Sequence, residues 1–305
     1  QDQVELALMR SGEHDVARSY VLYREERSRA RAQEKVAQQK PAGHAINVLE
    51  DGLRKPLDEA GLRRLVESAC VGLEGVASAD AILEATLRDL YDGVPMEEVR
   101  KSAILAARAL LEKDPAYSYV TARLLLNTIR CEVLGEEASH ASMEQRYTVY
   151  FPQFIQRGIA AELLDPRLAE FDLARLGAAL KSERDLQFGY LGLQTLYDRY
   201  FLHIDEQRIE LPQAFFMRVA MGLALNESQR EARAIEFYNV LSTFDFMSST
   251  PTLFNSGTLR SQLSSCYLTT VSDDLTGIYD AIKENALLAK YAGGLGNDWT
   301  PVRAL

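Results

Sequence analysis

Cys266 is the residue of this chain whose type and neighbours best suit redox chemistry. Ser264 and Ser265 precede it, and Tyr267 follows. Hydroxyl donors stabilise a thiolate, the form in which cysteine acts as a nucleophile. A single cysteine in a strand is more often a small buried apolar residue than a reactive thiol. Both interpretations stay open on these residues alone.

Thr250 lies in a second segment whose residues suit ligand binding. Residues 248–257 are rich in hydroxyl side chains, and Pro251 and Gly257 exclude a continuous helix. The loop expected here offers hydroxyl groups and free backbone amides to phosphate oxygens. An ordinary polar turn is the alternative interpretation of the same composition.

The run Gly-Gly-Leu-Gly at 293–296 lets a backbone approach a ligand closely. No Gly-Lys-Ser/Thr follows it, and it ends a helix instead of opening one, so it is neither a P-loop nor a dinucleotide fingerprint. A glycine loop that caps the preceding helix is the alternative.

Helices are expected over most of the first 245 residues, as the elements that position these segments. Asp114-Pro115 gives an N-cap and a proline at the first helical position, and Gly135 ends the apolar stripe that follows. The same start signal recurs at 165–166, and Pro212 opens another apolar segment. Three shorter amphipathic segments between residues 58 and 113 complete the pattern of a helical bundle.

The N-terminal part contains one internal likeness. Residues 17–21 resemble residues 116–120, and the helical pattern around them also matches, which indicates two tandem copies of one domain. The polar stretch 27–43 is expected to be a solvated helix end followed by a linker.

After residue 245 the pattern changes. The β-branched and aromatic residues of 262–271 predict a strand, and residues 276–291 predict a helix that leads into the glycine run. Strand, helix and glycine loop in this order indicate the beginning of an α/β domain.

Charge and composition exclude several classes of protein. The 305 residues carry a formal charge of −10, which disfavours a general nucleic-acid binder. No apolar run is long enough to span a bilayer. Three dispersed cysteines form no disulfide framework and fit a reducing cytosol, so a cytoplasmic location is expected. The four histidines share no ligand spacing, and no metal site is expected.

Five short motifs near the C-terminus follow one another in an order that indicates a single family. They are Ser249-Thr250-Pro251-Thr252-Leu253, Ser264-Ser265-Cys266, Asp273-Asp274-Leu275, Ala292-Gly293-Gly294-Leu295-Gly296 and Arg303-Ala304-Leu305. This series resembles the N-terminal part of the catalytic barrel of class I ribonucleotide reductase large subunits. Upstream, Ile209–Gln213, Met217–Gly222 and Arg184-Asp185 resemble the helical domain that precedes that barrel.

The resemblance implies a mainly α fold with four parts. These are the end of a first ATP-cone and a linker (1–40), a second ATP-cone (41–136), the helical domain (137–245) and the first strand and helix of a ten-stranded α/β barrel (246–305). In the second cone, Leu49 and Glu50 stand where the family usually has a basic pair. Because a carboxylate repels a triphosphate, this copy is expected to be degenerate.

The resemblance also implies a chemistry. The family reduces ribonucleoside diphosphates to deoxyribonucleotides: a thiyl radical abstracts a ribose hydrogen, water leaves the 2′ carbon, and two thiols supply electrons as they form a disulfide. Cys266 matches one thiol of that pair, and its partner is expected beyond residue 305. Thr250, Ser265 and Gly294 match positions that contact the substrate.

Allosteric control is implied by the same likeness. Asp273 matches a residue that binds the ribose of a deoxynucleoside triphosphate effector, Asp274 and Leu275 adjoin it, and Arg303 matches a phosphate-binding arginine of that site. The helix over 276–291 is expected at a homodimer interface. The expected partners and effectors are a metal-containing small subunit that generates the radical, ATP or dATP, and thioredoxin or glutaredoxin as reductant.

Two alternatives remain. A class II enzyme that uses adenosylcobalamin shares the barrel motifs, although the long helical domain and tandem cones favour class I. A non-catalytic nucleotide sensor built on an ATP-cone would need neither Cys266 nor the Thr250 segment.

Overall fold

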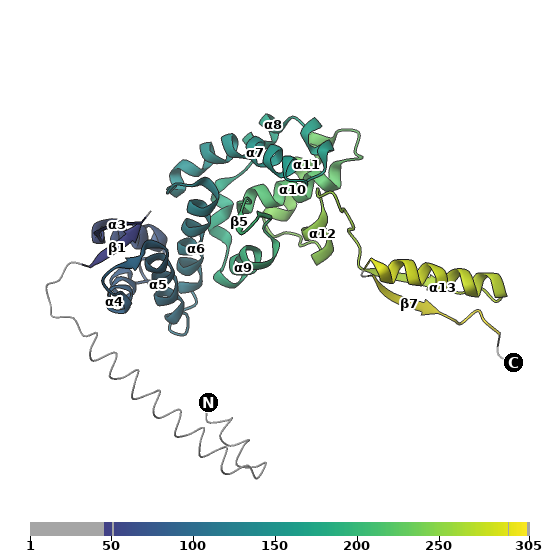
Figure 1. Ribbon diagram of the computed structural model, residues 1–305, viewed down its shortest axis with the longest axis horizontal. Helices are drawn as coiled ribbons and strands as arrows, with labels where there is room; N and C mark the ends of the chain where they lie inside the picture. The colour runs from purple at the N-terminus through teal and green to yellow at the C-terminus, as the bar shows by residue number, and fades with distance from the viewer. Residues whose placement is uncertain (1–45, 51, 292, 304–305) are drawn as a thin grey trace, which may run out of the picture.

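The computed structural model describes residues 46–50, 52–291 and 293–303 (Figure 1). The predicted first cone and the polar stretch 27–43, with one half of the internal likeness, lie outside the described residues. The described part is mainly helical, which confirms the predicted fold class. None of its helices is both long and apolar enough to cross a membrane.

The first region begins with a small sheet that the sequence did not predict. Its elements are β1 (Asn47–Glu50), β2 (Leu53–Pro56), α3 (Glu59–Cys70), α4 (Ala79–Asp89), β3 (Val94–Pro95), α5 (Met96–Ala109) and α6 (Tyr117–Leu134). Strand β1 pairs antiparallel with β2 and parallel with β3. Asp92 fixes this sheet by accepting hydrogen bonds from the backbone N and the Nδ2 of Asn47, both at 2.9 Å.

The predicted helices of this region are confirmed, although α6 begins at Tyr117, two residues after the predicted Pro115. Asp114 accepts a hydrogen bond from the backbone N of Ala116 in the turn before this helix. Local signals explain most of the helix ends. The side chains of Asp58 and Ser78 accept hydrogen bonds from backbone N–H groups at the starts of α3 and α4. Gly135 ends α6 with a φ of 74°, a left-handed conformation that favours glycine.

Helix α6 joins the first region to the second. It packs against α3 and α5 on one side (Figure 1). On the other side it packs against α9 (Tyr190–Thr195), the short helix η3 (Ser182–Gln187) and strand β5 (Gln207–Arg208). The buried apolar core runs without a break from Ile46 to Leu253. Both regions therefore pack against α6, and their apolar cores are continuous through it.

The second region consists of helices arranged around α10. Its elements are η1 (His140–Ser142), α7 (Met143–Ala160), η2 (Pro166–Glu170), α8 (Leu173–Ala178), η3 (Ser182–Gln187), α9 (Tyr190–Thr195), the π-helical turn η4 (Leu196–Tyr200), β4 (His203–Ile204), β5 (Gln207–Arg208), α10 (Pro212–Ala224), α11 (Arg230–Ser242) and α12 (Thr250–Asn255). Phe215 and Phe216 of α10 are almost wholly buried. Burial of each such side chain stabilises the folded state by roughly 1.5–3 kcal/mol.

Two predictions for this region need correction. The segment that begins at 165–166 is not one helix, because Asp165 caps the short η2 and Asp172 then caps a separate helix, α8. The predicted Thr250 loop contains a helix, α12, that begins at Thr250. Pro251 is compatible with it because a proline in the first helical turn needs no backbone donor.

The C-terminal region pairs two strands beside one helix. Strand β6 (Cys266–Thr270), helix α13 (Leu275–Lys290) and strand β7 (Gly294–Asp298) confirm the predicted strand and helix to within a few residues. The predicted glycine loop is wrong, since Gly294 begins β7. The strands are parallel with Cys266 opposite Gly294, so the backbone hydrogen bonds of β6 determine the conformation of the glycine run.

Candidate functional site

Cys266 is the first residue of β6 and has an exposed thiol. Ser265 lies beside it, with its Oγ 3.9 Å from Sγ. Gly294 is opposite Cys266 in the neighbouring strand, and a Cβ on this glycine would lie 3.1 Å from the backbone oxygen of Ser265 and 3.9 Å from Sγ. The structure thus brings together three of the predicted site residues, and the absent side chain at 294 leaves space beside the thiol.

The other two cysteines have different surroundings. Cys70 is buried at the end of α3, and Cys131 is partly buried in α6. Burial raises the pKa of each thiol, which disfavours the thiolate. Among the three cysteines of the chain, the thiol of Cys266 is therefore the accessible one.

Thr250 is exposed at the start of α12 and has one neighbour that sequence reasoning did not assign to the site. The hydroxyl of Tyr200 lies 3.2 Å from Thr250 Oγ1, and the Tyr200 ring stacks on Phe254 at a centroid distance of 4.3 Å. Tyr200 ends the π-helical turn η4, a kind of turn that is frequent at functional sites.

Helix α12 is connected to the segment that leads into Cys266. Thr252 Oγ1 donates a hydrogen bond to the backbone oxygen of Leu263, and Asn255 Nδ2 donates one to the backbone oxygen of Gln262. The candidate phosphate contact and the candidate redox thiol therefore belong to consecutive elements with a hydrogen-bonded connection.

The predicted effector residues form a second group. Arg303 Nε donates to Asp273 Oδ2 at 2.7 Å. Asp274 has a different role, because its carboxylate caps α13 by accepting from the backbone N of Gly277 at 2.8 Å and from the Ser272 hydroxyl at 2.8 Å. These bonds, that of Gly277 first, lower the pKa of Asp274. Leu275 is the first residue of α13 and is 72% exposed.

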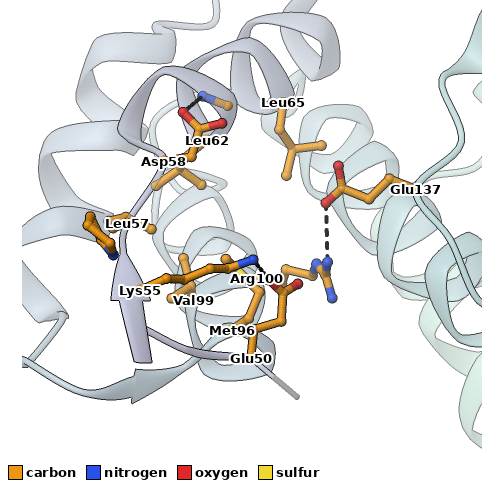
Figure 2. Close-up of a pocket in the computed structure, with 12 residues that line it drawn as sticks. Glu50, Lys55, Leu57, Asp58, Leu62, Leu65, Met96, Val99, Arg100 and Glu137 are labelled. Atoms are coloured by element: carbon orange, nitrogen blue, oxygen red, sulfur yellow. Dashed lines mark hydrogen bonds and ion pairs between the residues drawn. The ribbon is translucent and has the colours of Figure 1, made fainter. Parts of the chain in front are cut away.

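The hairpin β1–β2 borders a cavity of about 390 Å³ (Figure 2). Among the residues that the structure describes, the charged ones in its lining are Glu50, Lys55, Asp58, Arg100 and Glu137. Glu50 forms an ion pair with Lys55, and Arg100 Nη2 lies 3.1 Å from Glu137 Oε1. Both lining cations thus have a carboxylate partner within the cavity itself.

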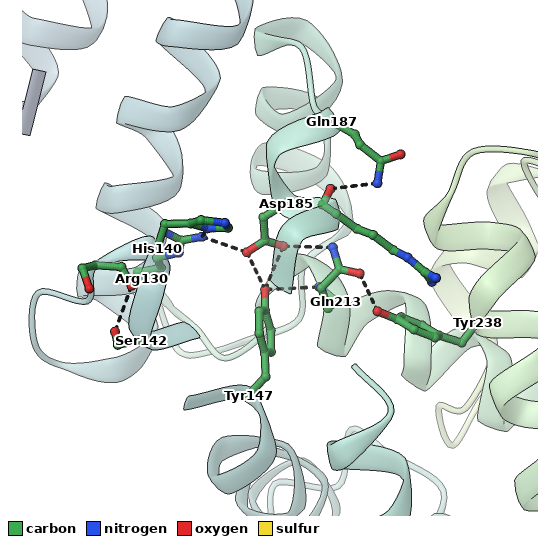
Figure 3. Close-up of polar contacts among 10 residues, drawn as sticks. Arg130, His140, Ser142, Tyr147, Asp185, Gln187, Gln213 and Tyr238 are labelled. Atoms are coloured by element: carbon green, nitrogen blue, oxygen red, sulfur yellow. Dashed lines mark hydrogen bonds and ion pairs between the residues drawn. The ribbon is translucent and has the colours of Figure 1, made fainter. Parts of the chain in front are cut away.

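Asp185 is the centre of a buried polar network between the helices (Figure 3). Its carboxylate accepts hydrogen bonds from Arg130 Nη2 at 2.9 Å, from the Tyr147 hydroxyl at 3.0 Å and from Gln213 Nε2 at 2.9 Å. The Tyr238 hydroxyl donates to Gln213 Oε1 at 2.8 Å. These side chains come from α6, η3, α7, α10 and α11, so the network fixes the packing of the region that carries α12.

Within residues 46–50, 52–291 and 293–303, no group of His, Cys, Asp or Glu side chains has the geometry to hold a metal ion.

Comparison with known proteins agrees with this arrangement. Residues 186–261 match the ribonucleotide reductase all-alpha domain, and residues 264–305 match the ribonucleotide reductase barrel domain. In an alignment of 309 positions that covers the whole chain, it is 44% identical to the ribonucleoside-diphosphate reductase subunit alpha of Chlamydia muridarum. It is 39% identical over 260 residues, 85% of its length, to the same subunit of Helicobacter pylori.

A eukaryotic large subunit is also similar to the chain. The ribonucleoside-diphosphate reductase large subunit of Danio rerio is 35% identical over 243 residues, 78% of the chain. The chain spans 29% of the Chlamydia relative, 32% of the Helicobacter relative and 30% of the Danio relative. The helical region with α12 comes first and strand β6 follows, in the same order as the two matched domains. The chain belongs to the ribonucleotide reductase large-subunit family.

Proposed function

We propose that this chain is part of a class I ribonucleoside-diphosphate reductase, an oxidoreductase that converts ribonucleoside diphosphates to 2′-deoxyribonucleoside diphosphates. Cys266 is one thiol of the reducing pair. The observation that carries this proposal is the exposed thiol at the start of β6, with Ser265 adjacent and Gly294 opposite.

The proposed chemistry assigns a role to each of these groups. A thiyl radical on another cysteine abstracts a ribose hydrogen, and water leaves the 2′ carbon. Cys266 and a partner thiol supply two electrons and two protons as their disulfide forms, and return of the abstracted hydrogen to the ribose restores the thiyl radical. Thr250 and Ser265 bind the substrate through their hydroxyl groups, and Gly294 lets the ribose approach Cys266. Because Cys70 is buried within α3 and Cys131 lies on α6, we assign the partner thiol to neither.

The same proposal includes the partners of the subunit. The radical originates in a metal-containing small subunit, and thioredoxin or glutaredoxin reduces the disulfide. Helix α13 packs against a second large subunit, a role supported by its exposed Tyr279 and Ile282 and by Ala281 as its one buried residue. Asp273 and Arg303 bind a deoxynucleoside triphosphate effector next to this helix.

Residues 41–136 are proposed to be an ATP-cone that has lost nucleotide binding. A triphosphate is repelled by a lining of net negative charge, and among the described residues the hairpin cavity has three carboxylates against Lys55 and Arg100. The pairing of both cations with carboxylates supports a structural role for this domain.

The central test is the Cys266→Ser variant of the complete subunit, assayed with its small subunit and a dithiol reductant. We expect loss of deoxynucleotide product while the fold, measured by circular dichroism, is unchanged. Cys131→Ser is the matched control and should keep its activity. Sustained turnover by Cys266→Ser would refute the assignment.

A further inference from the structure

Glu210 and Arg218 form an ion pair in which both side chains are fully buried. Arg218 Nε donates to Glu210 Oε1 at 2.7 Å, and Nη2 donates to Oε2 at 3.3 Å. Burial of two charges has a large desolvation cost, and such a pair is often no more stabilising than apolar side chains of the same volume. A positional role would explain why a helix as apolar as α10 contains this arginine.

The remaining donor of Arg218 is directed at the end of α12. Arg218 Nη1 donates to the backbone oxygens of Ser256 at 2.7 Å and of Leu253 at 3.2 Å. The helix end also lies directly against α10, because a Cβ on Gly222 would be 2.1 Å from the backbone N of Gly257. Glu210 orients the guanidinium, and the guanidinium holds the carbonyl groups at the end of α12.

Tyr200 contacts both ends of α12. Its ring stacks on Phe254 with an interplanar angle of 16°, and its hydroxyl lies 3.2 Å from Thr250 Oγ1. The ring also meets Phe215 of α10 edge to face. The threonine is thus fixed through its own hydroxyl and through the helix that carries it.

We propose that Tyr200 and the Glu210–Arg218 pair are positioning residues for Thr250: they fix its hydroxyl in the orientation that binds the substrate diphosphate. This inference rests on the proposed substrate contact of Thr250. On this proposal, the buried ion pair increases the affinity for substrate. A purely structural pair would affect only the stability of the fold.

The test uses the complete large subunit with its small subunit. Tyr200→Phe keeps the stacked ring and removes only the hydroxyl, so the fold should persist. We expect KM for the ribonucleoside diphosphate to rise about fivefold, the size expected for one hydrogen bond, with kcat and the unfolding temperature unchanged. Tyr197→Phe, in the same π-helical turn but bonded to Glu132, is the matched control and should leave KM unchanged.

A double-mutant cycle tests whether Tyr200 affects KM through Thr250. In a Thr250→Val background, Tyr200→Phe should produce no further rise in KM, because the group that it positions is absent. Arg218→Lys keeps the charge opposite Glu210 but loses the planar fork, and it should raise KM in the same direction.

Two outcomes contradict the proposals in different ways. If Thr250→Val raises KM while Tyr200→Phe and Arg218→Lys do not, the positioning role is wrong and the proposed function stands. If Thr250→Val itself leaves KM unchanged, the substrate contact is wrong and the positioning inference falls with it.

Discussion

Arg303 and Asp273 are 30 residues apart in sequence and lie on either side of α13 in the chain, yet Arg303 Nε is 2.7 Å from Asp273 Oδ2. The arginine is 77% exposed and the aspartate 33%, so the pair contributes little to stability. In the proposed effector site, the arginine that binds phosphate is therefore paired with the carboxylate that binds ribose until a nucleotide separates them.

Arg303→Gln should weaken binding of a deoxynucleoside triphosphate. The lost charge-assisted hydrogen bonds predict a fall in affinity of roughly 10- to 100-fold. Asp273→Asn should have a smaller effect, because the amide keeps one acceptor oxygen for ribose and its loss of charge weakens the pairing with Arg303. Titration calorimetry on the complete subunit measures both affinities, and equal affinities for wild type and Arg303→Gln would exclude this site.

Removal of the Asp185 carboxylate should destabilise the helical region strongly. Asp185→Ala leaves Arg130 buried without its ionic partner, a loss of about 3–5 kcal/mol in the free energy of unfolding. Tyr147→Phe removes one neutral donor to the same carboxylate and should cost about 1–3 kcal/mol. Denaturant unfolding provides the values, and Glu136→Gln, in an exposed pair with Arg146, is the control with almost no effect.

His140 should make stability depend on pH. Burial, and then the nearby positive charge of Arg130, lower the pKa of His140 below its usual 6.5. Between the folded and unfolded pKa values, the unfolded chain binds more protons, so the free energy of unfolding rises with pH. This contribution is fully present above the unfolded pKa and is lost as pH falls through the folded pKa.

The measurement for His140 is denaturant unfolding between about pH 5 and pH 8, a range that includes the ordinary histidine pKa. The His140→Gln variant should show a shallower rise of stability with pH than the wild type. Identical pH profiles for the two proteins would show that His140 is not the titrating group.

The hairpin cavity should bind ATP only after a change of charge. The wild-type chain is expected to show no ATP binding in calorimetry, because Glu50 pairs with Lys55 and adds negative charge to the lining. The double variant Leu49→Lys, Glu50→Arg should gain measurable affinity. ATP binding by the wild type that Arg100→Gln abolishes would contradict the proposed loss of function.

Local signals explain which elements the sequence could predict. Helix α6 has a start signal at Asp114 and a stop signal at Gly135, and both are properties of neighbouring residues. Strands β1, β2 and β3 have two to four residues each, too few for a hydrophobic alternation. Strand β1 pairs with its neighbour β2 in a hairpin and with β3, which is far away in sequence. Gly294 favours no strand by itself, so β7 depends on its pairing with β6.

The candidate site was predictable only in part for the same reason. Cys266, Ser265 and Gly294 meet as their motifs implied, and so do Asp273 and Arg303. The contacts of Tyr200 with Thr250 and of Arg218 with α12 are tertiary. The one available signal was an arginine in the otherwise apolar run of α10, which marks a buried charge and therefore a partner.

The three thiols should react with iodoacetamide in the order of their exposure. Cys266 is exposed and should be alkylated first, whereas Cys70 is 3% exposed and has a pKa raised by burial. Each unit of raised pKa lowers the thiolate fraction about tenfold, so Cys70 should be slowest and the partly buried Cys131 intermediate. Mass spectrometry of peptides from the native chain gives each rate, and denaturant should make the three rates similar. If Cys70 in the native chain reacts as fast as Cys266, the difference in accessibility that singles out Cys266 is wrong.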